Sequence, residues 1–288
     1  MTPIISVIVT TYNQEKYIAE AIDGILIQKG CPSFEIIIGN DCSTDLTAEV
    51  IQEYKNKYPE LIKVLPRTKN LGMQMNLKDC IENCSGDYIA ICEGDDYWID
   101  CYKLKKQYEL LKNSKEASFC FNDIYIKDEI SKNGKLKRHL KSSKKKLTSV
   151  ITFENLVEYQ NPVANFSCCM YKKEAMKLIP DSFYQTKAAD FLFNMYLLDH
   201  SIGIFLKDIC SVYRINQNSI YASIENEQKI LNRISAILYH NEIFKNKYKK
   251  SFYILLRKTI RGLFKERIIF SILLPFSGEK ISLIKSEF

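Results

Sequence analysis

Four apolar, strand-like segments alternate with helix-like segments between Ile4 and Cys92, and this alternation restricts the fold more than any other feature of the chain. Runs rich in β-branched residues are typical of strands buried on both faces of a parallel sheet. The predicted strands are 4–9, 34–38, 61–65 and 88–92, and the predicted helices are 15–28, 43–58 and 77–84. Ser43 or Thr44 is the expected N-cap of the second helix. Because parallel neighbours need crossover connections, the pattern predicts an α/β protein with an open, mostly parallel sheet flanked by helices.

After Trp98 the hydrophobic pattern no longer alternates regularly between strands and helices. We expect helices at 104–111, 153–159 and 190–200, and strands at 117–126, 166–171, 202–205 and 209–213. Residues 132–146 hold eight Lys or Arg and no acid, which is typical of a mobile loop. From Asn226 onward the pattern is helical, so we expect a C-terminal helical extension.

The net charge of +7 lies entirely in the tail, since residues 1–240 hold 30 residues of each sign. From Asn241 onward, 11 Lys or Arg face 4 Asp or Glu, with apolar residues at helical spacing. The nine-residue apolar run 268–276 is too short to span a bilayer. The tail is interpreted as a basic amphipathic helix on an anionic membrane surface. The alternative is a packed helix with a solvated basic face.

The chain begins MTPIISVIV and enters a strand-like run at once, without the pattern of a secretory signal. Its ten cysteines are scattered and form no CxxC pair. Both features favour reduced thiols in a cytoplasmic protein. We expect the tail to add peripheral contact with the cytoplasmic face of a membrane.

Polar residues gather directly after the predicted strands, where ligands bind in open α/β sheets. These positions are Thr10, Thr11 and Asn13, then Asn40 and Asp41, then Asn70, and finally Glu93, Asp95 and Asp96.

The most specific of these groups is Glu93-Gly94-Asp95-Asp96. Three carboxylates at the end of a buried strand repel one another unless a cation lies among them. Oxygen ligands of this kind suit Mg²⁺ or Mn²⁺, which also hold phosphate oxygens. The alternative is a solvated acidic turn. No GxGxxG and no GxxxxGK[ST] occurs, so the common glycine-rich phosphate-binding loops are absent from the sequence.

Several segments, taken together and in order, resemble glycosyltransferase family 2. They are ISVIVTTYNQEKYI, IIIGNDCSTDLTAEVI, KNLG and GDYIAICEGDDYW. The resemblance covers residues 4–125 strongly and continues weakly through 165–175, 187–208 and 212–216. It implies a GT-A fold in which residues 1–125 bind a nucleotide-sugar, residues 126–220 bind the acceptor, and residues 221–288 form the basic tail.

The resemblance also implies roles for individual residues. Thr10, Tyr12, Asn13, Asp41, Asn70, Asp95 and Arg214 would bind the donor, with a UDP-sugar as the first expectation. Asp96, Asp95 and Glu93 would bind Mn²⁺ or Mg²⁺. Asp190 would be the catalytic base of an inverting transfer, although Ala189 stands where Gly or Glu is usual. From the residues alone, the favoured interpretation of Asp190 is the N-cap of a helix, and the two roles are compatible.

The predicted function is transfer of a sugar to an acceptor hydroxyl, on a glycan or a lipid-linked acceptor, in cell-surface polysaccharide synthesis. One alternative is a relative that binds a nucleotide-sugar without catalysis. Another is a nucleic-acid-binding protein, which the neutral charge of residues 1–240 disfavours, so no nucleic-acid partner is expected.

Overall fold

The computed structural model describes residues 2–130, 135–140, 149–159, 162–185, 190–217 and 226–265. The chain divides into two compact units, which are described separately. The first comprises Met1–Thr152 and Val163–Ile215, and the second Phe153–Pro162 and Asn216–Phe288. All the site residues predicted from the sequence belong to the first unit.

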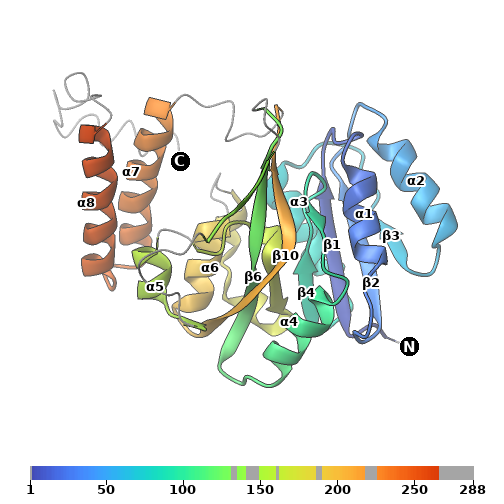
Figure 1. The fold of residues 1–288 in the computed structure, drawn as a ribbon, viewed down its shortest axis with the longest axis horizontal. Coiled ribbons are helices and arrows are strands. Elements are labelled where there is room, and N and C mark those ends of the chain that lie inside the picture. Colours follow the sequence, from blue (N-terminus) through green and yellow to red (C-terminus); the bar gives the residue numbers. More distant parts are fainter. Residues whose placement is uncertain are drawn as a thin grey trace. The chain divides into compact units, whose positions relative to one another are not determined.

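The first unit is built on one mixed sheet, in which the described residues form ten strands (Figure 1). The strands are β1 Ile5–Thr11, β2 Phe34–Asn40, β3 Ile62–Val64, β4 Tyr88–Ile91, β5 Tyr97–Trp98, β6 Ala117–Asp128, β7 Leu136–Arg138, β8 Val150–Ile151, β9 Cys169–Lys172 and β10 Ile202–Ile215. Their order is β3-β2-β1-β4-β9-β6-β10-β5, with β7 beside β6 and β8 beside β10. The predicted open, mostly parallel sheet is confirmed.

Strand direction decides which loops meet. Strands β3, β2, β1 and β4 are parallel to one another, and β6 and β10 are parallel to each other. Strand β9 runs antiparallel to both β4 and β6. The carboxyl ends of β1, β2, β4, β6 and β10 therefore share one edge of the sheet with the start of β9. We call this the carboxyl edge.

Helices flank this sheet (Figure 1). They are α1 Ile18–Leu26, α2 Thr47–Lys57, α3 Met73–Glu82, α4 Lys103–Lys112 and α6 Asp190–Leu198, with short 3-10 helices η1 Phe166–Cys168, η2 Lys173–Leu178 and η3 Asp181–Gln185. The core joins the apolar faces of β1, β2 and α1, where Val7, Ile22 and Ile36 are fully buried. Burying such side chains stabilises the fold by about 1.5–3 kcal/mol each.

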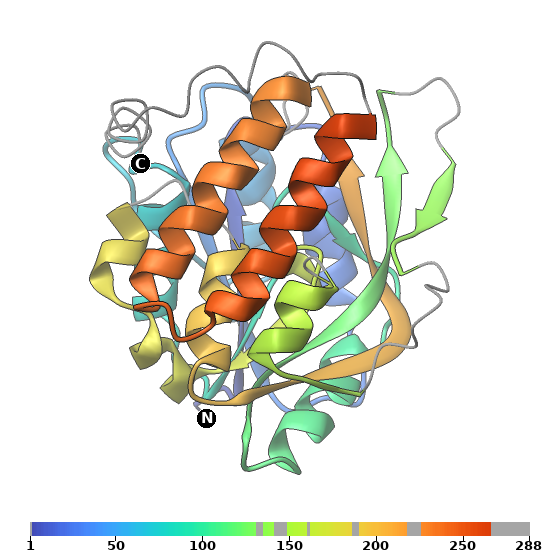
Figure 2. The same ribbon diagram turned by 90° about the vertical axis from the view of Figure 1, so that its left-hand side faces the viewer.

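The second unit is helical, with α5 Phe153–Glu158, α7 Asn226–Ile243 and α8 Lys249–Lys265 (Figure 2). Phe153 of α5 packs against the rings of Phe244, Tyr248 and Phe252, so α5 belongs with the C-terminal helices. None of the helices in the described part of the chain combines the length and apolar character needed to cross a membrane.

Three local predictions differ from the structure. Helix α2 begins at Thr47, and its N-cap position is Leu46, so the predicted caps Ser43 and Thr44 are wrong. The two strands predicted at 202–213 are one strand, β10, which continues through polar Lys207 and Asp208 by irregular pairing with β6. Residues 166–168 form a 3-10 turn before β9 begins.

Part of the predicted loop at 132–146 is also different, because Leu136–Arg138 forms β7 against β6. Residues 131–134 and 141–148 lie outside the described residues, as does the apolar run at 268–276. The ten cysteines are all free thiols, as predicted.

Candidate active site

The loops after β1 and β2 are joined by Asn13. Its backbone is in the left-handed region, with φ of 54°, which an asparagine tolerates better than most residues. Its Oδ1 accepts a hydrogen bond from Thr44 N at 2.8 Å, and its own N–H donates to Ser43 Oγ at 2.9 Å. The hydroxyl that the sequence suggested as a helix cap thus links two loops. Tyr12, beside this link, is 47% exposed and available to a ligand.

Asp41 and Asn70 meet at the carboxyl edge although 29 residues separate them. Asp41 is buried, and its Oδ1 and Oδ2 accept hydrogen bonds from Leu71 N at 2.7 Å and Gly72 N at 2.9 Å. Asn70 Nδ2 donates to the Asp41 carbonyl oxygen at 2.9 Å. Gly72 has a φ of 82°, which favours glycine there. Asp41 therefore fixes the loop that carries Asn70, and its predicted contact with the donor stays a prediction.

The acidic turn, Glu93–Asp96, follows β4 at the same edge. Gly94 N donates to the carbonyl oxygen of Thr10 at 2.9 Å, which joins the turn to the end of β1. A Cβ on Gly94 would lie 2.8 Å from Thr11 Cβ, which the β1 backbone holds in place, so glycine is required for this approach. The turn and the β1 loop are thereby held in one position.

Within the turn, Asp95 and Asp96 differ in their surroundings. Asp96 is fully buried; its Oδ1 accepts from Arg214 N at 2.9 Å and its Oδ2 from Asn165 Nδ2 at 2.5 Å. Glu93 and Asp95 are partly exposed. Asp96 is thus fixed by the protein and closed to solvent, whereas Glu93 and Asp95 keep part of their surface exposed.

The charges of four carboxylates converge here. Burial raises the pKa of Glu93 well above its usual range, and the charges of Asp96, Asp95 and Asp190 raise it further. Burial and the charge of Asp95 raise the pKa of Asp96 to about 7. On β10, the pKa of the Tyr213 hydroxyl is raised by burial and by the same four carboxylates. Asp190, which begins α6 about 95 residues after the turn in sequence, is therefore close to it in space.

The carboxylates suit a divalent cation because their mutual repulsion would be relieved by it. In the described part of the chain, however, no three His, Cys, Asp or Glu side chains are arranged to hold a metal ion by themselves. Mg²⁺ is commonly bound by one or two carboxylates together with substrate phosphates. The carboxylates fit an ion that arrives with a diphosphate, and the partly exposed Asp95 and Glu93 are the residues that could hold it.

Two functional candidates were missed by the sequence analysis. Asn165 Nδ2 bridges Asp96 and Glu93 Oε2, the latter at 3.3 Å, and Ser167 Oγ accepts from Glu93 N at 3.0 Å. The indole of Trp98 donates to the Ser167 carbonyl at 2.9 Å. Asn165 and Ser167 precede β9 and follow the acidic turn by about 70 positions. No local pattern marks them, because only the antiparallel course of β9 brings them to the turn.

Arg214 was predicted to bind the donor. In the structure its side chain is 1% exposed and forms ion pairs with Glu20 of α1 and Glu129 after β6. It lies beside the acidic turn, near the carboxyl end of β10. Its role is taken up below.

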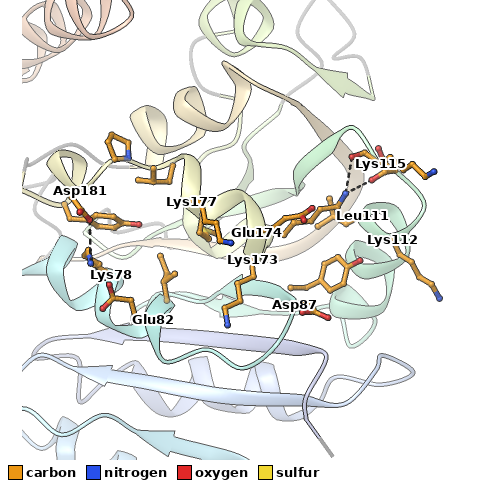
Figure 3. A pocket seen from close by; sticks show the side chains of 18 residues that line it. Lys78, Glu82, Asp87, Leu111, Lys112, Lys115, Lys173, Glu174, Lys177 and Asp181 are labelled. Carbon is orange, nitrogen blue, oxygen red and sulfur yellow. Dashed lines mark hydrogen bonds and ion pairs between the residues drawn. The ribbon is translucent and has the colours of Figure 1, made fainter.

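A pocket of about 1010 Å³ lies at the opposite edge of the sheet (Figure 3). Its lining includes Tyr88 at the start of β4 and Lys172 at the end of β9. Lys78 pairs with Asp181 at 3.7 Å on one side of it. Because the predicted site residues are absent from the described lining, we place the candidate site at the carboxyl edge.

Comparisons with known proteins identify the family and the type of fold. A family model described as Glycosyl transferase family 2 matches residues 6–179. An uncharacterized protein of Mycobacterium bovis is 42% identical over 121 residues, which make up 42% of this chain and 35% of that protein. The match therefore spans about a third of this curated relative's length.

TarS of Staphylococcus aureus is described as a poly(ribitol-phosphate) beta-N-acetylglucosaminyltransferase and is 33% identical over 93 residues, 32% of this chain and 16% of TarS. The structure of TarS 1–349 in complex with UDP-GlcNAc is similar with a TM-score of 0.59 at 22% identity, covering 77% of this chain and 61% of that one. The structure of the Pyrobaculum calidifontis mannosyltransferase in complex with GDP-Man and Mn²⁺ is similar with a TM-score of 0.61 at 15% identity. The match covers 94% of this chain and 77% of that one. These likenesses establish a GT-A type of fold.

Proposed function

Because the chain belongs to glycosyl transferase family 2, we propose that it transfers a sugar from a nucleotide-sugar to an acceptor hydroxyl. One observation supports the proposal: the charge of Asp190, at the start of α6, raises the pKa of Glu93 in the acidic turn, so the two carboxylates lie near enough to act on one substrate. Glycosyl transfer with a diphosphate leaving group needs both a place for the diphosphate charge and a base for the hydroxyl proton.

The donor would occupy the edge formed by the loops after β1, β2 and β4. Tyr12 and Asp41 would contact the nucleoside, with Thr10, Asn13 and Asn70 shaping the wall around it. A UDP-sugar is our first choice, and the solved relatives with UDP-GlcNAc and GDP-Man support a nucleotide-sugar in general. These same contacts would also serve a relative that binds without catalysis.

Asp95 and Glu93 would hold Mn²⁺ or Mg²⁺ together with the diphosphate oxygens, and Asp96 would contribute by fixing the turn. When bound, such an ion neutralises charge that develops on the leaving diphosphate. The complex of the Pyrobaculum enzyme with Mn²⁺ supports this choice of ion.

Asp190 would act as the base. Its carboxylate would accept the proton of the acceptor hydroxyl as that oxygen attacks the anomeric carbon, and the nucleoside diphosphate would leave from the opposite face. A single displacement of this kind inverts the anomeric configuration. The proton ends on Asp190 and the bonding pair on the diphosphate oxygen.

The acceptor would be a glycan or a lipid-linked precursor in polysaccharide synthesis. The name of TarS gives poly(ribitol-phosphate) as the acceptor of that relative. Helix α8 carries six Lys or Arg and no acid, and it exposes Tyr253 and Ile254. We include peripheral contact with the cytoplasmic face of a membrane through this helix in the proposal.

The proposal is tested by thermal unfolding with UDP-GlcNAc, UDP-glucose and GDP-mannose, each in Mn²⁺ and in EDTA. Binding to the native state should raise the melting temperature. At a ligand concentration of a hundred times the Kd, the free energy of unfolding rises by about 2.7 kcal/mol. At least one nucleotide-sugar should bind in Mn²⁺ and be turned over to its nucleoside diphosphate. Absence of binding to all of them contradicts the proposal, and binding without turnover would indicate the non-catalytic relative.

A further inference from the structure

The Arg214 side chain connects three separate parts of the first unit. Its NH2 pairs with Glu20 of α1, its Nε lies 3.0 Å from Glu129 Oε1, and its NH1 donates to the Asp95 carbonyl at 2.6 Å. NH1 and NH2 therefore donate hydrogen bonds within the protein, and Nε is held beside Glu129 by an ion pair without hydrogen-bond geometry. Its positive charge is matched by two carboxylates before any ligand binds.

Two tyrosine rings enclose the same guanidinium. Its central carbon lies 4.7 Å from the ring centre of Tyr17 and 4.7 Å from that of Tyr97. A planar guanidinium can stack on rings and still donate sideways, which a lysine ammonium cannot do. The arrangement therefore depends on arginine and restricts the side chain to one orientation.

The Arg214 backbone adds a second link to the acidic turn, because its N–H donates to Asp96 Oδ1 at 2.9 Å. One residue of β10 thus holds two consecutive residues of the turn, Asp95 through its carbonyl and Asp96 through its carboxylate. These two contacts fix the backbone from which the Asp95 side chain projects.

We propose that Arg214 is a positioning residue that, with Glu20 and Glu129, sets the geometry of the acidic turn for metal-dependent binding of the donor diphosphate. The inference rests on the proposed function and assigns Arg214 a different role from direct contact with the donor. The Arg214 side chain is 1% exposed and paired with both Glu20 and Glu129, so a diphosphate could touch the guanidinium only after side chains around it move.

The two roles differ in their dependence on metal. A residue that touches the diphosphate contributes to nucleotide binding with or without the ion. A residue that orients the metal ligands contributes only when the ion is present. Removing a residue that orients a metal ligand typically weakens metal affinity by about 10–100-fold.

The experiment compares wild type with Arg214→Met and Arg214→Lys, using UDP and GDP as probes. The shift in melting temperature is measured at several nucleotide concentrations, in EDTA and across a Mn²⁺ titration. The matched control is Arg138→Met, which removes another ion pair of the first unit, with Asp123 of β6.

We expect Arg214→Met to need about tenfold more Mn²⁺ for half of the maximal shift, with an unchanged shift in EDTA. Arg214→Lys should lie between Arg214→Met and wild type because it keeps the charge but loses the planar fork. Arg138→Met should need the same Mn²⁺ as wild type.

A smaller nucleotide shift for Arg214→Met in EDTA would show direct contact and overturn the inference. A Mn²⁺ requirement within twofold of wild type would also overturn it and leave a structural role. If Arg214→Met does not fold, the same measurement on Glu20→Gln and Glu129→Gln tests the inference. Each of these variants removes one ion-pair partner of Arg214 and should raise the Mn²⁺ concentration needed for half of the maximal shift. If neither UDP nor GDP shifts the melting temperature of the wild type in Mn²⁺, that result would instead contradict the proposed function itself.

Discussion

Asn165 shows how much a single side chain contributes to the acidic turn. Its amide donates to Asp96 at 2.5 Å and to Glu93 at 3.3 Å, so it links the two carboxylates that frame the turn. Its backbone follows Ala164, which has a φ of 67°, and its N–H donates to the Val163 carbonyl across that residue. Positive φ at a non-glycine residue costs energy and is concentrated at functional sites.

Replacing Asn165 by Asp should destabilise the protein by roughly 2–4 kcal/mol at pH 8, because a hydrogen bond to a charged group becomes a contact between two carboxylates. The new pair gains a proton more readily when folded than when unfolded, so the lost stability should return as the pH falls toward 5. Urea unfolding at several pH values measures this. Asn165→Ala is the control, since it loses the bond without adding charge, and equal pH dependence in both variants would contradict the explanation.

The residues of the donor side could be predicted from the sequence, whereas those of the opposite wall could not. Asp41, Glu93 and Asp95 follow strands directly, so strand prediction alone places them at one edge. Asn165 and Ser167 reach that edge through an antiparallel strand inserted between β4 and β6, which nothing in their local sequence indicates. Asp190 was identified only through the family resemblance.

At the scale of elements, the buried strands were the most predictable part of the fold. Strands β1, β2 and β4 lie within a residue or two of the predicted ranges because apolar β-branched runs have few alternatives. The sequence predicted two strands in place of β10 because Lys207 and Asp208 interrupt the apolar pattern. In the structure, pairing with β6 keeps the two parts in one strand. The start of α2 was missed because Asp45, and not Ser43 or Thr44, accepts the Thr47 N–H.

Helix α8 separates its side chains into two faces. Phe252 and Leu255 are buried in the second unit, while Lys249, Lys250, Arg257 and Lys258 are exposed together with Tyr253. This face combines cations with an aromatic residue, as membrane-surface helices do. Attraction of a basic residue to an anionic membrane is worth about 1 kcal/mol.

The double variant Arg257→Gln/Lys258→Gln should therefore bind vesicles that contain phosphatidylglycerol about 30-fold more weakly at low salt, which corresponds to about 2 kcal/mol. Co-sedimentation with vesicles measures the affinity. Lys105→Gln/Lys112→Gln removes the same charge from exposed positions of α4 and should bind as wild type does. Equal binding by all three proteins would leave α8 with a purely structural basic face.

At the scale of the whole molecule, the proposed function depends on residues from both halves of one sheet. The acidic turn belongs to the first, parallel half, and Asp190 and Arg214 belong to the half that contains β6 and β10. The charge of Asp190 reaches Glu93, and Arg214 holds the turn directly. Donor binding and proton transfer are thereby assigned to different halves, which makes them separable by mutation.

The most direct test of this division is a measurement of donor binding and of nucleoside diphosphate release on one preparation of Asp190→Asn. The substitution keeps the shape of the side chain and removes its capacity to accept the proton. We predict donor affinity within about threefold of wild type, and release slower by roughly 10²–10⁴-fold, the usual contribution of a positioned base. Asparagine caps a helix about as well as aspartate, so a residue that only begins α6 would leave both quantities nearly unchanged. Release at the wild-type rate by a variant that binds the donor normally would contradict the assignment of Asp190 and the division of roles built on it.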